Sequence, residues 1–222
     1  AMLMKGTPVE EPGTSEAEHN PAHLEGLTIS QAVRTRSLWV LFAIFGLAYA
    51  GMMMVMYHLA AHAKDIGHPA MMGAALLSAL SIGGIVGRFT GAVASDRMAK
   101  KILLALMLAV LVVTLVLLPS ATSTWMLYAF AIVFGLCEGV WGPMIASLTG
   151  ETFGLRYSAG IIGVVAVSYG IGGTIGPTFA GYIFSDTGSY SIAFYTGAAA
   201  LALASILCFF IKPVKIPSSS AQ

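Results

Sequence analysis

Arg88 is the residue of this sequence whose chemistry is easiest to name. It stands inside a long apolar stretch, eight residues before Asp96, so on a helix it lies about 12 Å deeper than that residue. Half of the hydrocarbon core of a bilayer is about 15 Å thick, and a charge held inside it is costly and usually functional. A guanidinium offers a planar fork of donors that matches a carboxylate. Arg88 is therefore predicted to bind an anion; the alternative is a charge buried against a neighbouring helix.

Glu138 is the second ionisable residue deep in an apolar run, about 13 residues after the run begins. A carboxyl group removed from water holds a proton more readily than one in solution. Glu138 is therefore a candidate for proton coupling or for pairing with Arg88. The alternative is a neutral acid that is hydrogen-bonded to a neighbouring helix.

Histidine and tyrosine side chains supply weaker candidates for a binding site. His58 and His62 are four residues apart and share a helix face, but the nearby loop offers too few further ligands for a metal, so no metal or cofactor is expected. His58, Tyr57 and Tyr169 are candidates for lining a substrate cavity, and the alternative is packing or anchoring at the membrane interface. Fainter candidates for the same role are Tyr49, Trp141 and Ser168.

Membrane-spanning helices must position these residues. The chain has 222 residues, of which 57% are hydrophobic and 9% are charged, whereas a soluble domain carries about 25% charged residues. Lipid offers the backbone no hydrogen-bond partner, so apolar runs of about 20 residues must be helices. The predicted fold is all-α, with six transmembrane helices at about residues 38–62, 72–94, 101–119, 125–148, 158–184 and 190–211.

Both ends of the chain are expected on the cytoplasmic side of an inner or plasma membrane. Basic residues gather at one end of the predicted helices and Lys64 alone stands at the other, which is the asymmetry of cytoplasmic loops. Residues 1–33 and 213–222 are predicted to be flexible tails around a bundle at 34–212. The bilayer is the expected partner, and no basic stripe indicates nucleic acid. The residues on the predicted cytoplasmic side are Arg34, Arg36, Arg97, Lys100, Lys101, Arg156, Lys212 and Lys215.

Glycine and proline residues inside the predicted helices indicate close packing or flexibility. Gly172 and Gly176 form a small-xxx-small pair, as two glycines of the second run do, and such pairs let helix backbones approach closely. Packing alone is one interpretation, and helices that slide or rock are the other. Pro143 and Pro177 each remove one helix hydrogen bond and are expected to kink the fourth and fifth helices.

Residues 88–101 resemble the loop motif between helices eight and nine of the major facilitator superfamily, an Arg followed by Gly-x-x-x-Asp-Arg-x-Gly-Arg-Lys. The sequence keeps Asp96, Arg97, Lys100 and Lys101 and has alanine at two glycine positions of the pattern. The resemblance implies that these charges form a conformational latch. The alternative is ordinary solvated loop charges.

Three further segments carry the same resemblance. Residues 150–163 and 170–194 are similar to the start and the end of helix eleven of that superfamily. Residues 27–42 resemble the start of helix seven in its monocarboxylate-transporter and oxalate–formate-antiporter branch. The resemblance covers about residues 27–212. It implies one six-helix half-bundle, the carboxy-terminal one, of a twelve-helix fold, with residues 1–33 in the central loop and with an amino-terminal half or a second copy as partner.

The resemblance also implies a function. A secondary active transporter, working as a symporter or antiporter by alternating access, would move a small organic anion such as a monocarboxylate, held by Arg88, with Glu138 as the candidate for coupling its movement to a proton. The acid that related transporters often carry one turn before this arginine is replaced by Gly84. The alternatives are a transporter of a sugar, drug or amino acid, or a truncated membrane protein that transports nothing. No catalytic spacing is present, so an enzyme is not expected.

Overall fold

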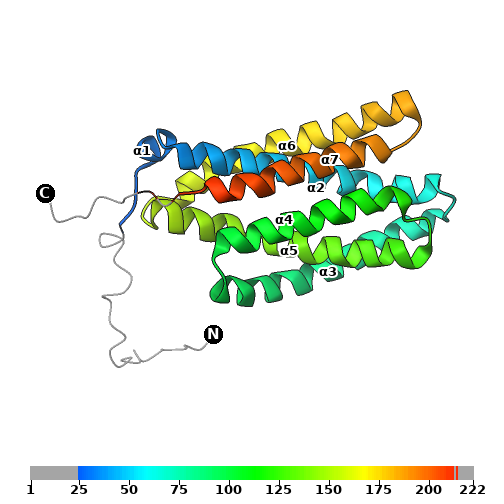
Figure 1. The fold of residues 1–222 in the computed structure, drawn as a ribbon, viewed down its shortest axis with the longest axis horizontal. Coiled ribbons are helices and arrows are strands. Elements are labelled where there is room, and N and C mark those ends of the chain that lie inside the picture. Colours follow the sequence, from blue (N-terminus) through cyan, green and yellow to red (C-terminus); the bar gives the residue numbers. More distant parts are fainter. Residues whose placement is uncertain (1–24, 213, 215–222) are drawn as a thin grey trace, which may run out of the picture.

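The computed structural model describes residues 25–212 and Val214, and six of its helices are long and apolar enough to cross a membrane. Figure 1 shows these helices side by side along the long axis of the molecule. The elements in chain order are α1 (Ile29–Val33), α2 (Arg36–Asp65), α3 (Ala70–Arg97), α4 (Lys100–Leu117), the 3-10 turn η3 (Leu118–Ser120), α5 (Thr124–Phe153), α6 (Ser158–Thr187), α7 (Ser191–Leu207) and the 3-10 turn η4 (Cys208–Phe210).

The predicted fold class is confirmed, and the chain is an integral membrane protein. The charged loop between the second and third spans is shorter than the sequence predicts. Asp96 and Arg97 belong to the last turn of α3, and Lys100 and Lys101 belong to the first turn of α4. Polar residues can join helix ends because water at the membrane surface satisfies the terminal backbone groups. Hydropathy alone therefore predicts helices that are too short on both sides of this loop.

The last part of the predicted amino-terminal tail is folded. Thr28 caps α1: its side-chain oxygen accepts a hydrogen bond from the Gln31 N–H, and the Gln31 side chain accepts one from the Thr28 N–H. This reciprocal arrangement is a capping box, and a helix of five residues is too short to show apolar periodicity. The expected tail at residues 1–24, 213 and 215–222 lies outside the described residues.

Two pairs of helices, α3 with α5 and α2 with α6, cross in close contact. Glycine makes both crossings possible. A Cβ atom at Gly139 would overlap the carbonyl oxygen of Gly84, and a Cβ atom at Gly172 would overlap that of Gly46. Backbones therefore touch without side chains between them, as small residues allow in membranes. The helices α2, α3 and α4 form one unit and α5, α6 and α7 form a second. The contact of α3 with α5 in the first unit corresponds to the contact of α6 with α2 in the second. Each unit has three spans, an odd number, so the two units run in opposite directions through the membrane.

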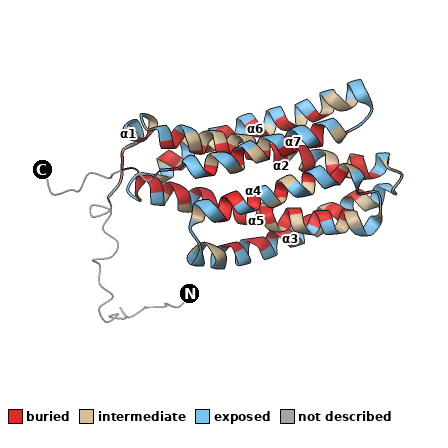
Figure 2. Ribbon diagram, viewed as in Figure 1, coloured by how far each residue is buried: buried red, intermediate tan, exposed pale blue. Residues whose placement is uncertain are grey.

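Burial separates the inner and outer faces of helices that are apolar all round. Figure 2 shows buried residues concentrated where helices face one another. On α4, Leu104, Leu108, Leu111 and Leu115 are all at most 1% exposed, and their spacing of four, three and four residues follows one helix face. Leu106 on the same helix is 53% exposed. Both faces are apolar because one meets protein and the other meets lipid.

An antiparallel contact fastens the segment before α1 to the loop between α5 and α6. The Leu27 N–H donates to the Phe153 carbonyl over 2.8 Å, and Gly26 forms an isolated β-bridge with Gly154. Gly154 has a φ of +87°, which favours glycine. A Cβ atom there would also overlap the carbonyl oxygen of Glu25. The contact is called the clip below.

The carboxy-terminal end of the described chain reaches the same place. The Ser37 hydroxyl donates to the Lys212 carbonyl over 2.9 Å, and the Val214 N–H donates to the Thr152 carbonyl over 3.4 Å. The first and the last described segments thus both lie against the end of α5.

Gly154→Ala is expected to destabilise the protein more than Gly67→Ala. Both glycines have positive φ, +87° and +96°, so alanine is strained at either position. Gly154 also has a ψ of 172°, a region essentially restricted to glycine, where the strain is about 1–3 kcal/mol. Only position 154 adds steric overlap, because nothing lies within 4 Å of a Cβ atom at Gly67. Thermal unfolding of the two variants in detergent measures the difference. Equal melting temperatures would mean that the clip contributes nothing to stability.

Candidate functional site

Arg88 and Glu138 lie close together where α3 crosses α5. A Cβ atom at Gly84 would lie 3.3 Å from Glu138 Oε2, and Arg88 follows Gly84 by one turn on the same side of α3. The Arg88 charge acts electrostatically on the Glu138 carboxyl. Their side chains are farther apart than an ion pair: within residues 25–212 and 214, the pair closer than 4.0 Å is Lys100–Glu151. Arg88 is exposed and Glu138 is half-buried, so the guanidinium is open to a third group.

An aromatic cluster draws on three helices, one of which is α5, the helix that carries Glu138. Phe45 and Tyr49 come from α2, Trp141 from α5 and Tyr169 from α6. The rings of Phe45 and Trp141 meet edge to face with centroids 4.6 Å apart, and those of Tyr49 and Tyr169 stack at 4.8 Å. Trp141 and Tyr169 complete the cluster at 6.1 Å. The cluster joins the α2–α6 crossing to α5.

Two buried polar atoms of the aromatic cluster, Trp141 Nε1 and Tyr169 Oη, lie next to each other. The Trp141 N–H is directed at the Tyr169 oxygen, outside strict hydrogen-bond geometry, and the Tyr169 hydroxyl has no acceptor among the residues that the structure describes. Buried polar groups are normally satisfied, so the Tyr169 O–H is the donor that a bound molecule could use. Trp141 follows Glu138 by three residues, a spacing that places both on one side of α5. The sequence made Trp141 a faint candidate only, although this spacing from Glu138 is a signal that it contained.

The candidates Tyr57 and His58 lie toward the carboxy-terminal end of α2, apart from Arg88. The His58 ring shares a hydrogen bond of 3.0 Å with the Pro177 carbonyl of α6, and Tyr57 is 69% exposed. His58 and His62 both pack against the ring of Tyr190, at 4.9 and 6.3 Å. Burial, with Asp65 as a lesser cause, raises the pKa of the Tyr190 phenol. No group of three or more His, Cys, Asp or Glu residues able to hold a metal ion occurs in the described part of the chain.

The charges of the loop motif sit at the junction of α3 and α4. Lys100 Nζ lies 3.4 Å from Glu151 Oε2 near the end of α5, while Asp96, Arg97 and Lys101 are exposed. Exposed ion pairs contribute about 0–1 kcal/mol, so this one adds little to stability. It does connect the motif to the end of the helix that carries Glu138.

The glycines and prolines singled out in the sequence fall at different places. Gly172 and Gly176 are buried against the backbone of α2, at Gly46 and Ala50. Pro143 and Pro177 lie inside α5 and α6, and each helix continues through its proline to a length of 30 residues. The carbonyl of Pro177 holds the His58 ring, so the proline turn is also a contact between α2 and α6.

Comparisons with known proteins agree with this architecture. The family model described as Major Facilitator Superfamily matches residues 1–122 and 41–222. Monocarboxylate transporter 7 of Homo sapiens is 27% identical over 203 residues, which cover 88% of this chain and 38% of that protein. Monocarboxylate transporter 13 of Bos taurus is 31% identical over 146 residues, which cover 65% of this chain and 34% of that protein. The chain thus spans little more than a third of the length of these relatives.

Two more distant likenesses complete the comparison. Citrate exporter 1 of Yarrowia lipolytica is 28% identical over 127 residues, 57% of this chain and 19% of that protein. A crystal structure of a Major Facilitator Superfamily transporter, FucP, in the outward conformation superposes with a TM-score of 0.68 at 24% identity, covering 84% of this chain and 45% of that chain. At that identity the superposition bears on the fold alone.

Proposed function

Because this chain belongs to the major facilitator superfamily, we propose that it forms half of a secondary transporter that moves a small organic anion, such as a monocarboxylate, by alternating access. The observation that carries the proposal is the open Arg88 guanidinium next to Glu138. A guanidinium has more donors than a single acid can use, so this pair suits a further ligand that is negatively charged. The printed names of the relatives, monocarboxylate transporters and a citrate exporter, point to the same class.

Charge balance suggests how the anion and a proton would move together. When the site is empty, Glu138 is the negative charge nearest to Arg88 in space and the two balance. An incoming carboxylate pairs with the Arg88 guanidinium and places a second negative charge beside Glu138. Like charges at close range favour protonation of one of them. Glu138 then takes up a proton, and anion and proton cross the membrane together.

The half-bundle needs a partner for this cycle, and both its ends lie on the cytoplasmic side of an inner or plasma membrane in the proposed arrangement. Superfamily members rock two bundles about a site between them. Exposed apolar residues on α3 and α6, such as Ile82, Phe89 and Ile175, suit such a contact. The partner is an amino-terminal six-helix half or a second copy of this chain. In that arrangement Asp96 and Arg97 act as the latch that holds one conformation.

Uptake of carboxylates into proteoliposomes tests the proposed function. The reconstituted chain is expected to accumulate at least one of radiolabelled lactate, pyruvate, oxalate, formate and succinate above protein-free liposomes. Unlabelled lactate should compete, whereas lactamide, which has nearly the same shape without the charge, should not. Equal competition by lactamide would contradict an anion site and favour another solute class. No uptake of any of the five would contradict a transporter made of two copies of this chain and would leave the amino-terminal six-helix half as the required partner.

A further inference from the structure

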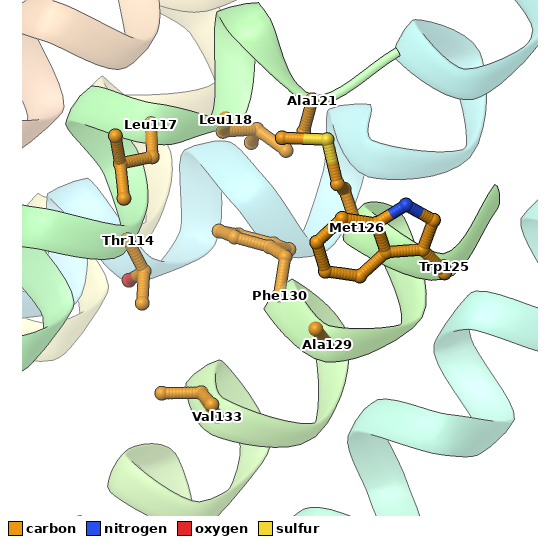
Figure 3. A pocket seen from close by; sticks show the side chains of 9 residues that line it. All are labelled: Thr114, Leu117, Leu118, Ala121, Trp125, Met126, Ala129, Phe130 and Val133. Atoms are coloured by element: carbon orange, nitrogen blue, oxygen red, sulfur yellow. The ribbon is translucent and has the colours of Figure 1, made fainter. Parts of the chain in front are cut away.

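A groove lies between α4 and α5 at the end of the bundle where α4 gives way to η3. Its volume is about 260 Å³. The floor is made of core residues, since Phe130 is 6% exposed and Leu118 is fully buried, and the rim is open, since Leu117 is 56% and Trp125 71% exposed. Figure 3 shows these side chains around a common space, with Val133 at the far end from Ala121.

The groove faces away from the candidate site. Ala129 lines it, and Glu138 stands nine residues further along the same helix. At 3.6 residues per turn, nine residues bring a side chain to the opposite side of the helix. α5 therefore presents Glu138 on one side and the groove on the other. The groove opens on the lateral surface of a membrane-spanning helix, and what lies there is lipid.

The lining offers a ligand almost no hydrogen bonds. Thr114 is the one hydroxyl among the lining residues, and it already donates to the Leu111 carbonyl over 2.8 Å. Figure 3 shows the six-membered ring of Trp125 toward Phe130 and its nitrogen on the other side. A polar head would find no partner inside. Hydrocarbon fits such a lining.

The dimensions of the groove favour a single chain over a helix. Trp125 and Val133 are eight residues apart, which is about 12 Å along a helix. Spread over that length, the volume gives a mean cross-section on the order of 20 Å², against about 80 Å² for a helix that is 10 Å across. A partner helix is too thick to enter. Trp125, at the second position of α5, marks the membrane interface, so the groove runs from there into the hydrocarbon.

We propose that this groove is a lipid site that holds one acyl chain of a membrane phospholipid, whose headgroup stays at the level of Trp125. The acyl chain would lie on Phe130, which packs in turn on Phe134 in the core with ring centroids 5.5 Å apart. A bound lipid is thereby coupled to the packing of α4 against α5. This proposal is independent of the transported substrate.

Photolabelling tests the lipid site. The chain is reconstituted in phosphatidylcholine vesicles with a trace of phosphatidylcholine that carries a diazirine on one acyl chain, then irradiated and digested. Mass spectrometry is expected to find more label on residues 114–133 than on other lipid-facing segments. Ala129→Trp fills the groove and should abolish the excess, while Ala109→Trp, exposed on α4 outside the groove, should leave it unchanged.

Three results would overturn the proposal. The first is even labelling of all exposed helix faces. The second is an excess that survives Ala129→Trp in a protein whose melting temperature shows it to be folded. The third is an excess that vanishes when cholesterol is added, since that would make a sterol the occupant.

Discussion

Arg88→Gln is expected to reduce carboxylate uptake by about 100-fold or more. The proposed contact between Arg88 and the bound carboxylate is a hydrogen-bonded charge pair enclosed by the transporter, and removing one member of such a pair costs about 2–5 kcal/mol. Glutamine keeps a polar side chain but has neither the positive charge nor the two-pronged fork of donors. Initial rates of uptake in proteoliposomes measure the effect. Arg88→Lys keeps the positive charge without the fork of donors, so its uptake rate should fall between those of the unchanged protein and of Arg88→Gln.

A matched control is available on the same helix. Arg97 is exposed in the last turn of α3, nine residues beyond Arg88 and on the other side of the helix, so Arg97→Gln removes the same charge without touching the site. It should leave the apparent KM for the anion unchanged, even if the latch role slows turnover. Full uptake by Arg88→Gln would rule out the proposed carboxylate contact.

Glu138→Gln is expected to abolish proton-driven accumulation, and Gly84→Asp is expected to restore part of it in the double variant. A Cβ atom at position 84 lies 3.3 Å from Glu138 Oε2, so an aspartate there puts a carboxylate into nearly the same space, one turn from Arg88. Gly84→Asp alone crowds two carboxylates together and should lower uptake. The measurement is uptake with and without an inward proton gradient, analysed as a double-mutant cycle.

The neutral control for this exchange is Gly84→Asn combined with Glu138→Gln. Asparagine has the size of aspartate but cannot release a proton, so this variant should remain uncoupled. If the aspartate and asparagine variants behave alike in folded protein, a carboxylate at position 84 does not replace Glu138. Proton-driven accumulation that persists in Glu138→Gln alone would show that Glu138 is not the proton carrier.

The six helices could be predicted because bilayer thickness and backbone hydrogen bonding leave long apolar runs no other structure. Which helices pack against one another could not be predicted. Gly172 and Gly176 signal a close approach in the sequence, but a small residue does not say which backbone approaches it, and the structure places α2 there. Gly139 at the other crossing carries the same signal, because it forms a small-xxx-small pair with Gly135, but nothing in the sequence links it to Gly84, 55 residues away along the chain.

The candidate site was predictable in its charges and not in its surroundings. Arg88 and Glu138 stand out because ionisable residues are rare in apolar runs. Trp141 and Tyr169 do not, since an aromatic residue is ordinary in a membrane helix and only the folded structure brings the two rings within 6.1 Å. The clip was also hidden, because backbone hydrogen bonds such as Leu27 to Phe153 leave no pattern in side chains.

The meeting of the first and last described segments on α5 separates the order of the helices from their packing. Leu27 and Val214 bond to the adjacent residues Phe153 and Thr152, so a short linker could join a variant trimmed to these two positions. New termini could then be opened at the link between α3 and α4, which faces the same side of the membrane as the clip. Such a circular permutant would keep every helix crossing and the orientation of every span. The packing of the six helices is in this sense independent of which loop is left open.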